Sequence, residues 1–253
     1  MSSATFAANR ARGAVSFDVV NENGITRRGA LHESGSLRVR FPSPEGEGLS
    51  AVLLNTAGGI AGGDRFNIDI AAGRGTQLTL TTAAAEKVYR TADAAAELSI
   101  VLKAAAGATL AWLPQETILF DRARLSRRID IGLAEGASLL LAEIVVFGRA
   151  AMGETMRLGA LVDRWRVRRG GRLVFAETVR LEGEIGDKLA RPAIAGGGAA
   201  IGTLLIVPAT RPWLRDCARR RRPLAPRSGF QPGMDLQWRA SVPKMLRGSA
   251  PIW

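Results

Sequence analysis

Apolar and polar residues alternate with a period of two through most of the chain, from residue 14 to about residue 207. Such alternation is typical of β-strands with one buried face. Three segments repeat one plan, in which an alternating run, a turn rich in glycine and alanine, and a second apolar run follow one another. They are residues 67–80, 98–112 and 128–141. Their turn glycines, Gly75, Gly107 and Gly136, lie 32 and 29 residues apart, a spacing typical of stacked units.

The pattern therefore predicts a mostly β protein with a single layered domain, built either as a β-solenoid (β-helix-like) or as a sandwich. A β-hairpin is predicted at residues 163–181, with Gly170 and Gly171 in its turn, an arginine-rich outward face and an apolar inward face. Short helices are predicted only at the alanine-rich residues 82–89 and at residues 150–158. The last apolar strand is expected at residues 200–207.

After Pro208 the regular pattern ends. We therefore divide the chain into a β domain, residues 10–207, and an atypical basic C-terminal segment, residues 208–253, which is either disordered or the product of a frameshifted reading. Within that segment, residues 211–228 contribute +6 to the net charge of +12. A basic patch of this kind suits nucleic acid or an acidic partner. A basic, β-rich nucleic-acid-binding protein is therefore the alternative function. It is disfavoured because aromatic residues make up only 6% of the chain and do not alternate with basic ones.

Histidine and cysteine are nearly absent, which limits metal and hydrolytic chemistry. His32 is the only histidine and Cys217 the only cysteine. One chain therefore cannot form a disulfide, a closed zinc site of Cys and His ligands or an imidazole-rich nickel site. Any metal would be held by carboxylates and backbone oxygens, or by ligands shared with a partner. A hydrolase would have to use His32, which we expect at the surface, and the sequence has no Gly-x-Ser-x-Gly motif. We therefore expect no enzymatic activity.

The N-terminal residues lack the apolar stretch of a secretory signal, and no apolar run approaches the roughly 20 residues of a spanning helix. These features predict a soluble, cytoplasmic protein without a membrane partner.

Residues 55–64 hold four glycines within six positions, followed by Asp64. A phosphate-binding P-loop would end in Gly-Lys-Ser/Thr, whereas the carboxylate of Asp64 would repel phosphate. A tight, conformationally demanding turn is the favoured interpretation. In residues 112–121, Pro114 ends a strand and presents Gln115 and Glu116. These two side chains lie either at a plain strand break or along an interior polar passage or partner surface.

Four ordered segments, residues 55–64, 81–90, 112–121 and 147–154, together resemble the urease accessory protein UreD (UreH) family. The resemblance covers roughly residues 10–207 and fails afterwards, apart from residues 246–253. The motif positions that we expect to have structural or partner-binding roles are Asn55, Gly58, Gly59, Gly62, Gly63, Tyr89, Arg90, Gln115, Gly148, Arg149, Met152, Gly153 and Glu154.

The resemblance implies a solenoid-like, non-enzymatic nickel-insertion chaperone. Its implied partners are a helical UreF-like accessory protein, a UreG-like GTPase and apo-urease. The resemblance implies that no cofactor is held tightly and that nickel passes transiently through the interior. Glu177 stands where relatives carry a glutamate, and we expect it to line this passage, with Asp64 and Glu116 as further candidates.

Overall fold

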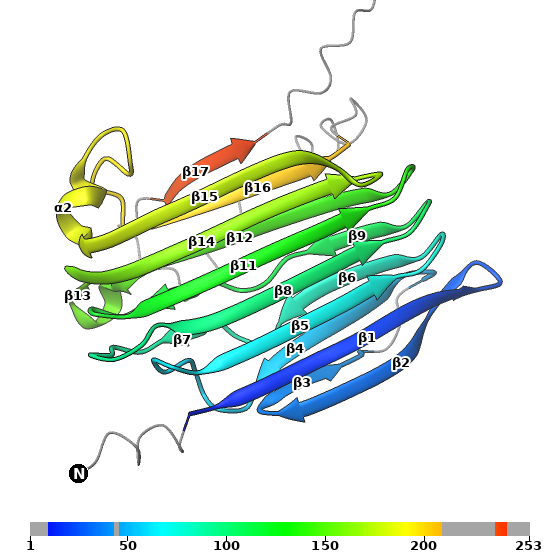
Figure 1. The fold of residues 1–253 in the computed structure, drawn as a ribbon, viewed down its shortest axis with the longest axis horizontal. Helices are drawn as coiled ribbons and strands as arrows, with labels where there is room; N and C mark the ends of the chain where they lie inside the picture. The colour runs from blue at the N-terminus through cyan, green and yellow to red at the C-terminus, as the bar shows by residue number, and fades with distance from the viewer. Residues whose placement is uncertain (1–9, 43–45, 209–235, 242–253) are drawn as a thin grey trace, which may run out of the picture.

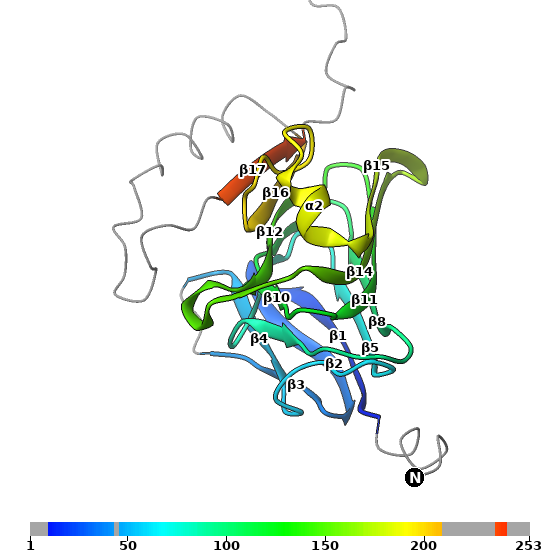
Figure 2. The same cartoon turned by 90° about the vertical axis from the view of Figure 1, so that its left-hand side faces the viewer.

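Two β-sheets face each other in this computed structural model, which describes residues 10–42, 46–208 and, as backbone only, 236–241 (Figures 1 and 2). The first sheet contains, in spatial order, β15 (Arg172–Glu184), β14 (Leu158–Arg169), β11 (Arg124–Leu133), β8 (Ala96–Ala104), β5 (Arg65–Ala72), β1 (Arg12–Glu22) and β2 (Ile25–Gly35). The main path of the second sheet is β17 (Leu236–Ser241), β16 (Ala200–Val207), β12 (Ser138–Arg149), β9 (Thr109–Trp112), β6 (Gln77–Thr82), β4 (Leu49–Asn55) and β3 (Leu37–Arg40).

The centre of both sheets is a stack of parallel coils, which confirms the solenoid-like interpretation. Each predicted repeat places one strand in each sheet, as β5–β6, β8–β9 and β11–β12, and equivalent strands of successive repeats pair in parallel. The turn glycines stack as well. Gly107 has φ +72, and a Cβ added to it would lie 3.8 Å from the Cα of Gly75. The 32- and 29-residue spacing therefore measures one complete coil.

Antiparallel pairs close the stack at both ends. β1 pairs with β2, and β3 with β4, at one end. β14 pairs with β15, and β12 with β16, at the other. The predicted hairpin is therefore confirmed, and its turn residues Gly170 and Gly171 have φ of +52 and +80.

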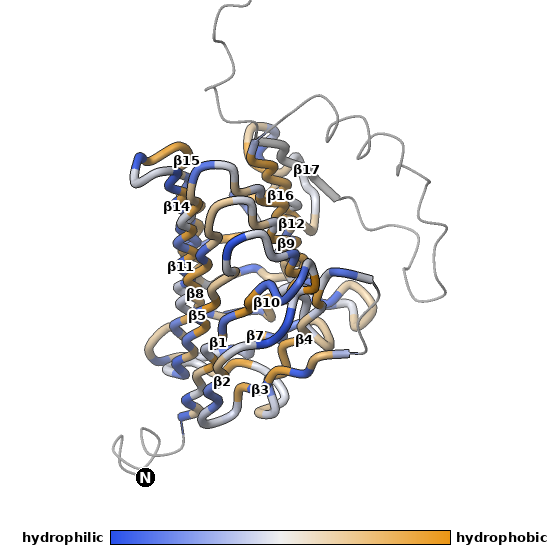
Figure 3. Tube along the Cα trace, turned by 90° about the vertical axis from the view of Figure 1, so that its right-hand side faces the viewer, coloured by the Kyte–Doolittle hydropathy of each residue, from blue (hydrophilic) through white to orange (hydrophobic). Residues whose placement is uncertain are grey.

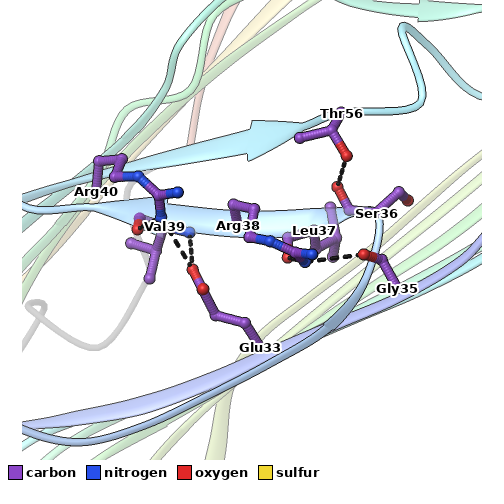
Figure 4. Close-up of polar contacts among 8 residues, drawn as sticks. All are labelled: Glu33, Gly35, Ser36, Leu37, Arg38, Val39, Arg40 and Thr56. Atoms are coloured by element: carbon purple, nitrogen blue, oxygen red, sulfur yellow. Dashed lines mark hydrogen bonds and ion pairs between the residues drawn. The ribbon is translucent and has the colours of Figure 1, made fainter.

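Between β2 and β3 the chain crosses from the first sheet to the second at a tight corner (Figure 4). Gly35 has φ +59, and a Cβ there would lie 1.7 Å from the carbonyl oxygen of Arg12. Glu33 Oε1 accepts a hydrogen bond from the backbone N–H of Val39 at 2.6 Å, and Thr56 Oγ1 donates to the Ser36 carbonyl at 3.0 Å. These contacts fix the corner against the glycine-rich loop that begins at residue 55.

The helix predictions need correction. Residues 82–89 are not helical, because they contain the short strand β7 (Glu86–Val88), which pairs in parallel with β10 (Thr117–Leu119). At residues 150–158 only η1 (Ala150–Met152) is helical, as one 3₁₀ turn that ends at Gly153 in the left-handed region, and β13 (Glu154–Thr155) follows. α2 (Ile185–Ala190), which follows β15, was not predicted from the sequence.

The core lies between the sheets and consists mainly of aliphatic side chains from the inner faces of the strands. Figure 3 shows apolar and polar positions alternating along the strands, as the period of two requires. The predicted strand at residues 200–207 is confirmed as β16. β17, from the segment that we separated as residues 208–253, pairs in parallel with β16. The predictions of disorder or a frameshift fall on residues 209–235 and 242–253, which lie outside the described residues. Among the residues that are described, no helix has the length and apolar character needed to cross a bilayer.

Candidate functional site

The four sequence motifs meet along one flank of the stack, at the strand ends where the chain returns from the second sheet to the first through β7, β10 and β13. This flank is at the left in Figure 1 and faces the viewer in Figure 2. We call it the motif end and define it by residues 55–64, 83–95, 113–123 and 148–158. The Tyr89 hydroxyl donates to the Gly58 carbonyl at 2.7 Å, and Asn55 Nδ2 donates to the Gly59 carbonyl at 3.0 Å. Segments far apart in sequence therefore build one surface.

Aromatic and charged side chains of three motifs pack in a row at the motif end. The rings of Tyr89 and Phe120 meet edge to face with centroids 5.2 Å apart. The guanidinium carbon of Arg149 lies 4.1 Å from the Phe120 ring centroid, and Arg149 also forms an ion pair with Glu154. Gly59 has φ +146, and a Cβ there would lie 2.5 Å from the Tyr89 ring. The motif residues thus fit against one another.

Asp64 holds the glycine-rich loop in place. Its side chain is buried, Oδ1 accepts a hydrogen bond from the Ala11 N–H at 2.8 Å, and Oδ2 accepts one from the Ala61 N–H at 2.7 Å. A Cβ on Gly62 would lie 2.2 Å from the Thr91 hydroxyl oxygen, so this position requires glycine. The loop is followed by β5 and not by a helix, which agrees with the predicted tight turn.

A cavity of about 380 Å³ runs from the motif end into the space between the sheets. Exposed Ala83, Ala84 and Gln115 line one part of it, and buried Arg127 and Glu143 line another. Most of the lining is apolar. The carboxylate of Glu86, which accepts a hydrogen bond from Asn55 Nδ2 at 3.2 Å, is a further polar group.

Three charged side chains form a buried cluster that connects the two sheets. Arg127 on β11 donates to both oxygens of Asp163 on β14, with Nε–Oδ1 at 3.0 Å and Nη2–Oδ2 at 2.6 Å. Arg127 Nη2 also lies 2.5 Å from Glu143 Oε2 on β12, as an ion pair without the geometry of a regular hydrogen bond. Trp112 Nε1 donates to Glu143 Oε1 at 2.6 Å. Buried charges persist when they are paired in this way.

A second, small cavity of about 20 Å³ lies on the other side of this cluster. Arg127 and Glu143 line both cavities, and Asp163, Trp165, Val179 and Thr203 are among the other residues that line the second. The charged cluster therefore separates two hollow regions of the interior.

The sequence profile of the UreD urease accessory protein family matches residues 11–247. The chain belongs to this family. Its relatives include the urease accessory protein UreD of Rhodopseudomonas palustris strain BisA53, which is 76% identical over 206 residues, covering 81% of this chain and 72% of the relative. The UreD protein of Bradyrhizobium diazoefficiens strain USDA 110 is 72% identical over 208 residues, covering 82% of this chain and 75% of the relative. The predicted family resemblance is confirmed.

This UreD family member does not gather the three predicted passage residues into one site. Asp64 lies in the glycine-rich loop, Glu116 is half-buried just before β10, and Glu177 is on β15. Glu177 lies opposite Trp165 in the β14–β15 pair, so its side chain shares the inner face. Within the described ranges, no three His, Cys, Asp or Glu side chains are close enough to hold a metal ion together.

The buried charges of the UreD fold were missed in the sequence analysis. Burial raises the pKa of Glu86 to about 7, although the hydrogen bond from Asn55 opposes the shift. Burial, together with the nearby charge of Asp163, raises the pKa of Glu143, although Arg127 and Trp112 oppose the shift. The period-two pattern could have shown that Arg127, Glu143 and Asp163 occupy inward positions, because each alternates with buried aliphatic or aromatic residues.

Two alternative interpretations gain no support from the UreD structure. His32 is exposed on β2 and does not line the main cavity, as expected for a surface histidine. The nucleic-acid alternative depended on residues 211–228, which lie outside the described residues.

Proposed function

We propose that this chain is a non-enzymatic nickel-insertion chaperone for urease. In this proposal it acts in the cytoplasm, binds apo-urease together with a UreF-like accessory protein and a UreG-like GTPase, and lets nickel pass to the urease active site. The observation that carries the proposal is the family match over residues 11–247, with relatives that are named urease accessory protein UreD at 68–76% identity.

The two interior cavities support passage through the protein. Glu86 lines the larger cavity, Glu143 lines both and Asp163 lines the smaller one, and Arg127 neutralises part of their charge. Carboxylate oxygens bind nickel more weakly than a cage of thiolates or imidazoles would. Weak binding suits a cargo that must leave, as it does in ion pores. We therefore propose that nickel is held transiently and that no tightly bound cofactor is needed.

Among the three candidate passage residues, Glu177 has the strongest support, because it shares the inner face with Trp165, which lines the second cavity. Glu116 is close to the larger cavity, because its carbonyl accepts a hydrogen bond from the N–H of Glu86 at 2.8 Å. Both carboxylate oxygens of Asp64 accept backbone hydrogen bonds. We therefore assign Asp64 to holding the loop at the motif end.

The proposal is tested by co-purification and by urease activation in a strain that lacks its own UreD. The wild-type chain should co-purify with the UreF-like and UreG-like proteins and restore activity. Glu177→Ala should leave the complex intact and lower activation about fivefold, equivalent to about 1 kcal/mol in the barrier to transfer. Glu97→Ala, on the exposed face of β8, is the matched control and should behave as wild type.

Two outcomes would contradict these assignments. A wild-type chain that forms no complex and restores no activity would overturn the chaperone proposal. An intact complex with unchanged activation in Glu177→Ala would remove Glu177 from the path and leave the scaffold role standing.

A further inference from the structure

An open groove crosses the motif end beside the aromatic row. It consists of two hollows of about 650 and 540 Å³. Thr91 and Arg122 line both hollows, Arg90 and Arg157 line the first, and Arg124 lines the second. We call this surface the arginine groove. It lies at the ends where β8, β11 and β14 begin, away from the interior cavities.

The backbone of the arginine groove is firmly held. Arg122 has φ +66, a left-handed conformation that residues other than glycine seldom adopt. Its N–H donates to the Leu158 carbonyl at 2.9 Å, and its carbonyl accepts from the Thr91 N–H at 3.1 Å. Asp121 Oδ1 accepts hydrogen bonds from the N–H groups of Arg157 and Leu158 at 2.8 and 3.0 Å. A strained residue that its surroundings hold in place points to a role for its side chain.

Of the four arginines that line the groove, Arg157 forms an ion pair with Asp121 at 3.8 Å, and the other three have no carboxylate partner within the described residues. Arg90, Arg122 and Arg124 are exposed, and none of the three forms an ion pair with another described residue. The carboxylates around them are already engaged, since Glu154 pairs with Arg149 and Glu182 pairs with Arg180 at 3.0 Å.

Asp121 is the third carboxylate of the groove, and its pKa is lowered. Burial raises this pKa, but the hydrogen bonds from Leu158 and Arg157 and the charges of Arg157 and Arg122 outweigh burial. Asp121 therefore stays ionised and hydrogen-bonded to the backbone. The guanidinium groups of Arg90, Arg122 and Arg124, which form no ion pair within the described residues, face solvent.

One exposed apolar side chain lines the same groove, since Leu158 in the second hollow is 41% exposed. Tyr89 and Met152 are exposed elsewhere on the motif end, at 36% and 71%. Arginine, tyrosine and methionine are enriched at protein interfaces, and arginine and tyrosine are common among the residues that dominate the binding energy. A groove that combines arginines with an exposed apolar side chain differs from a purely electrostatic phosphate-binding surface.

We propose that the arginine groove docks an acidic segment of a partner protein, in which spaced glutamate or aspartate side chains reach Arg90, Arg122 and Arg124 and an apolar side chain contacts Leu158. Guanidinium groups bind carboxylates through paired, charge-assisted hydrogen bonds. Asp121, Glu154 and Glu182 also line the groove and would repel a continuous polyanion such as nucleic acid. Because these carboxylates and the arginines line the same groove, a peptide with spaced carboxylates fits better. This docking role is separate from the nickel path.

The test uses the full chain and a short fluorescent peptide in which glutamate alternates with leucine and alanine, together with the same peptide carrying glutamine instead. The wild-type chain should bind the glutamate peptide, with an affinity that falls as the salt concentration rises, and should not bind the glutamine peptide. Arg122→Gly should weaken binding about tenfold without lowering thermal stability, because glycine adopts φ +66 without strain.

The matched control is Arg74→Gly, an exposed arginine in the turn after β5, at the opposite end of the strands. It should leave affinity unchanged. The proposal is overturned if the wild-type chain does not bind the glutamate peptide, or if Arg74→Gly weakens binding as much as Arg122→Gly. Tighter, Arg122-dependent binding of a single-stranded DNA of equal charge would replace the acidic segment with a phosphate ligand. The assay contains neither nickel nor urease, so its result does not depend on the chaperone proposal.

Discussion

Glu86 combines a carboxylate with a poorly solvated position between the sheets and the motif end. Burial raises its pKa to about 7, and the amide of Asn55 is its one side-chain hydrogen-bond donor in the described structure. Since the folded protein favours the protonated form, the charge on Glu86 opposes folding once it ionises. The effect is absent below the unfolded pKa of about 4.5, grows as pH rises, and is complete above about 7.

Glu86→Gln removes this penalty and keeps an acceptor for Asn55. We expect the variant to be as stable as wild type at pH 4.5, and more stable by up to about 3 kcal/mol at pH 8. Urea denaturation at the two pH values measures the difference. Glu97→Gln, on the exposed face of β8, is the control. Equal gains for Glu86→Gln at both pH values would show that burial does not control the titration of Glu86.

At the scale of elements, the stacked coils and the motif-end loop use glycine for different reasons. Position 107 requires glycine only because its backbone is left-handed, since the nearest atom to an added Cβ would be 3.8 Å away. Position 59 requires glycine for two reasons, its positive φ and the lack of space for a side chain. A Cβ there would lie 2.5 Å from the Tyr89 ring and 2.9 Å from the Lys87 carbonyl oxygen.

Gly107→Ala should therefore lower the free energy of unfolding by about 1–2 kcal/mol, the strain of a left-handed alanine. Gly59→Ala should lower it further, because overpacking adds about 1–3 kcal/mol. Chemical denaturation of the two variants compares them directly. If Gly59→Ala were no less stable than Gly107→Ala, the contact with Tyr89 would be looser than the structure indicates.

The repeated elements could be predicted from sequence, and the short ones could not. The coils were predictable because alternation and glycine spacing both mark them. β7 has only three residues, too few for a pattern, and alanine at residues 83–85 favoured the wrong prediction of a helix. Its conformation is set by pairing with β10, including the hydrogen bond from the Glu86 N–H to the Glu116 carbonyl at 2.8 Å.

At the scale of the whole molecule, the charged cluster clamps one sheet to the other. Arg127 and Asp163 belong to the first sheet and Glu143 to the second. The alternating pattern shows that Arg127, Glu143 and Asp163 each point inward. The contact between them depends on the stacking of coils, which brings residues 127, 143 and 163 together. The layered fold and the motifs could therefore be predicted from the sequence, and the interior site could not.

Arg127→Met leaves Glu143 and Asp163 buried without their counter-ion. We expect it to lower the free energy of unfolding by about 3–5 kcal/mol. The triple variant Arg127→Met, Glu143→Gln, Asp163→Asn carries no buried charge and should recover most of that loss. Denaturation curves for both variants test the clamp. A mild effect of Arg127→Met would mean that water reaches the carboxylates.

The parallel stack also determines how the chain can assemble as it is synthesised. β1 and β2 can pair early, but β1 also pairs with β5 although β2, β3 and β4 lie between them in sequence, so the parallel part of the first sheet cannot begin until β5 has left the ribosome. Each later coil then adds to an edge that is already formed. Until β15 and β16 close the stack, the nascent chain exposes unpaired strand edges, which are templates for association with other chains. Slow translation of the last third should therefore favour aggregation.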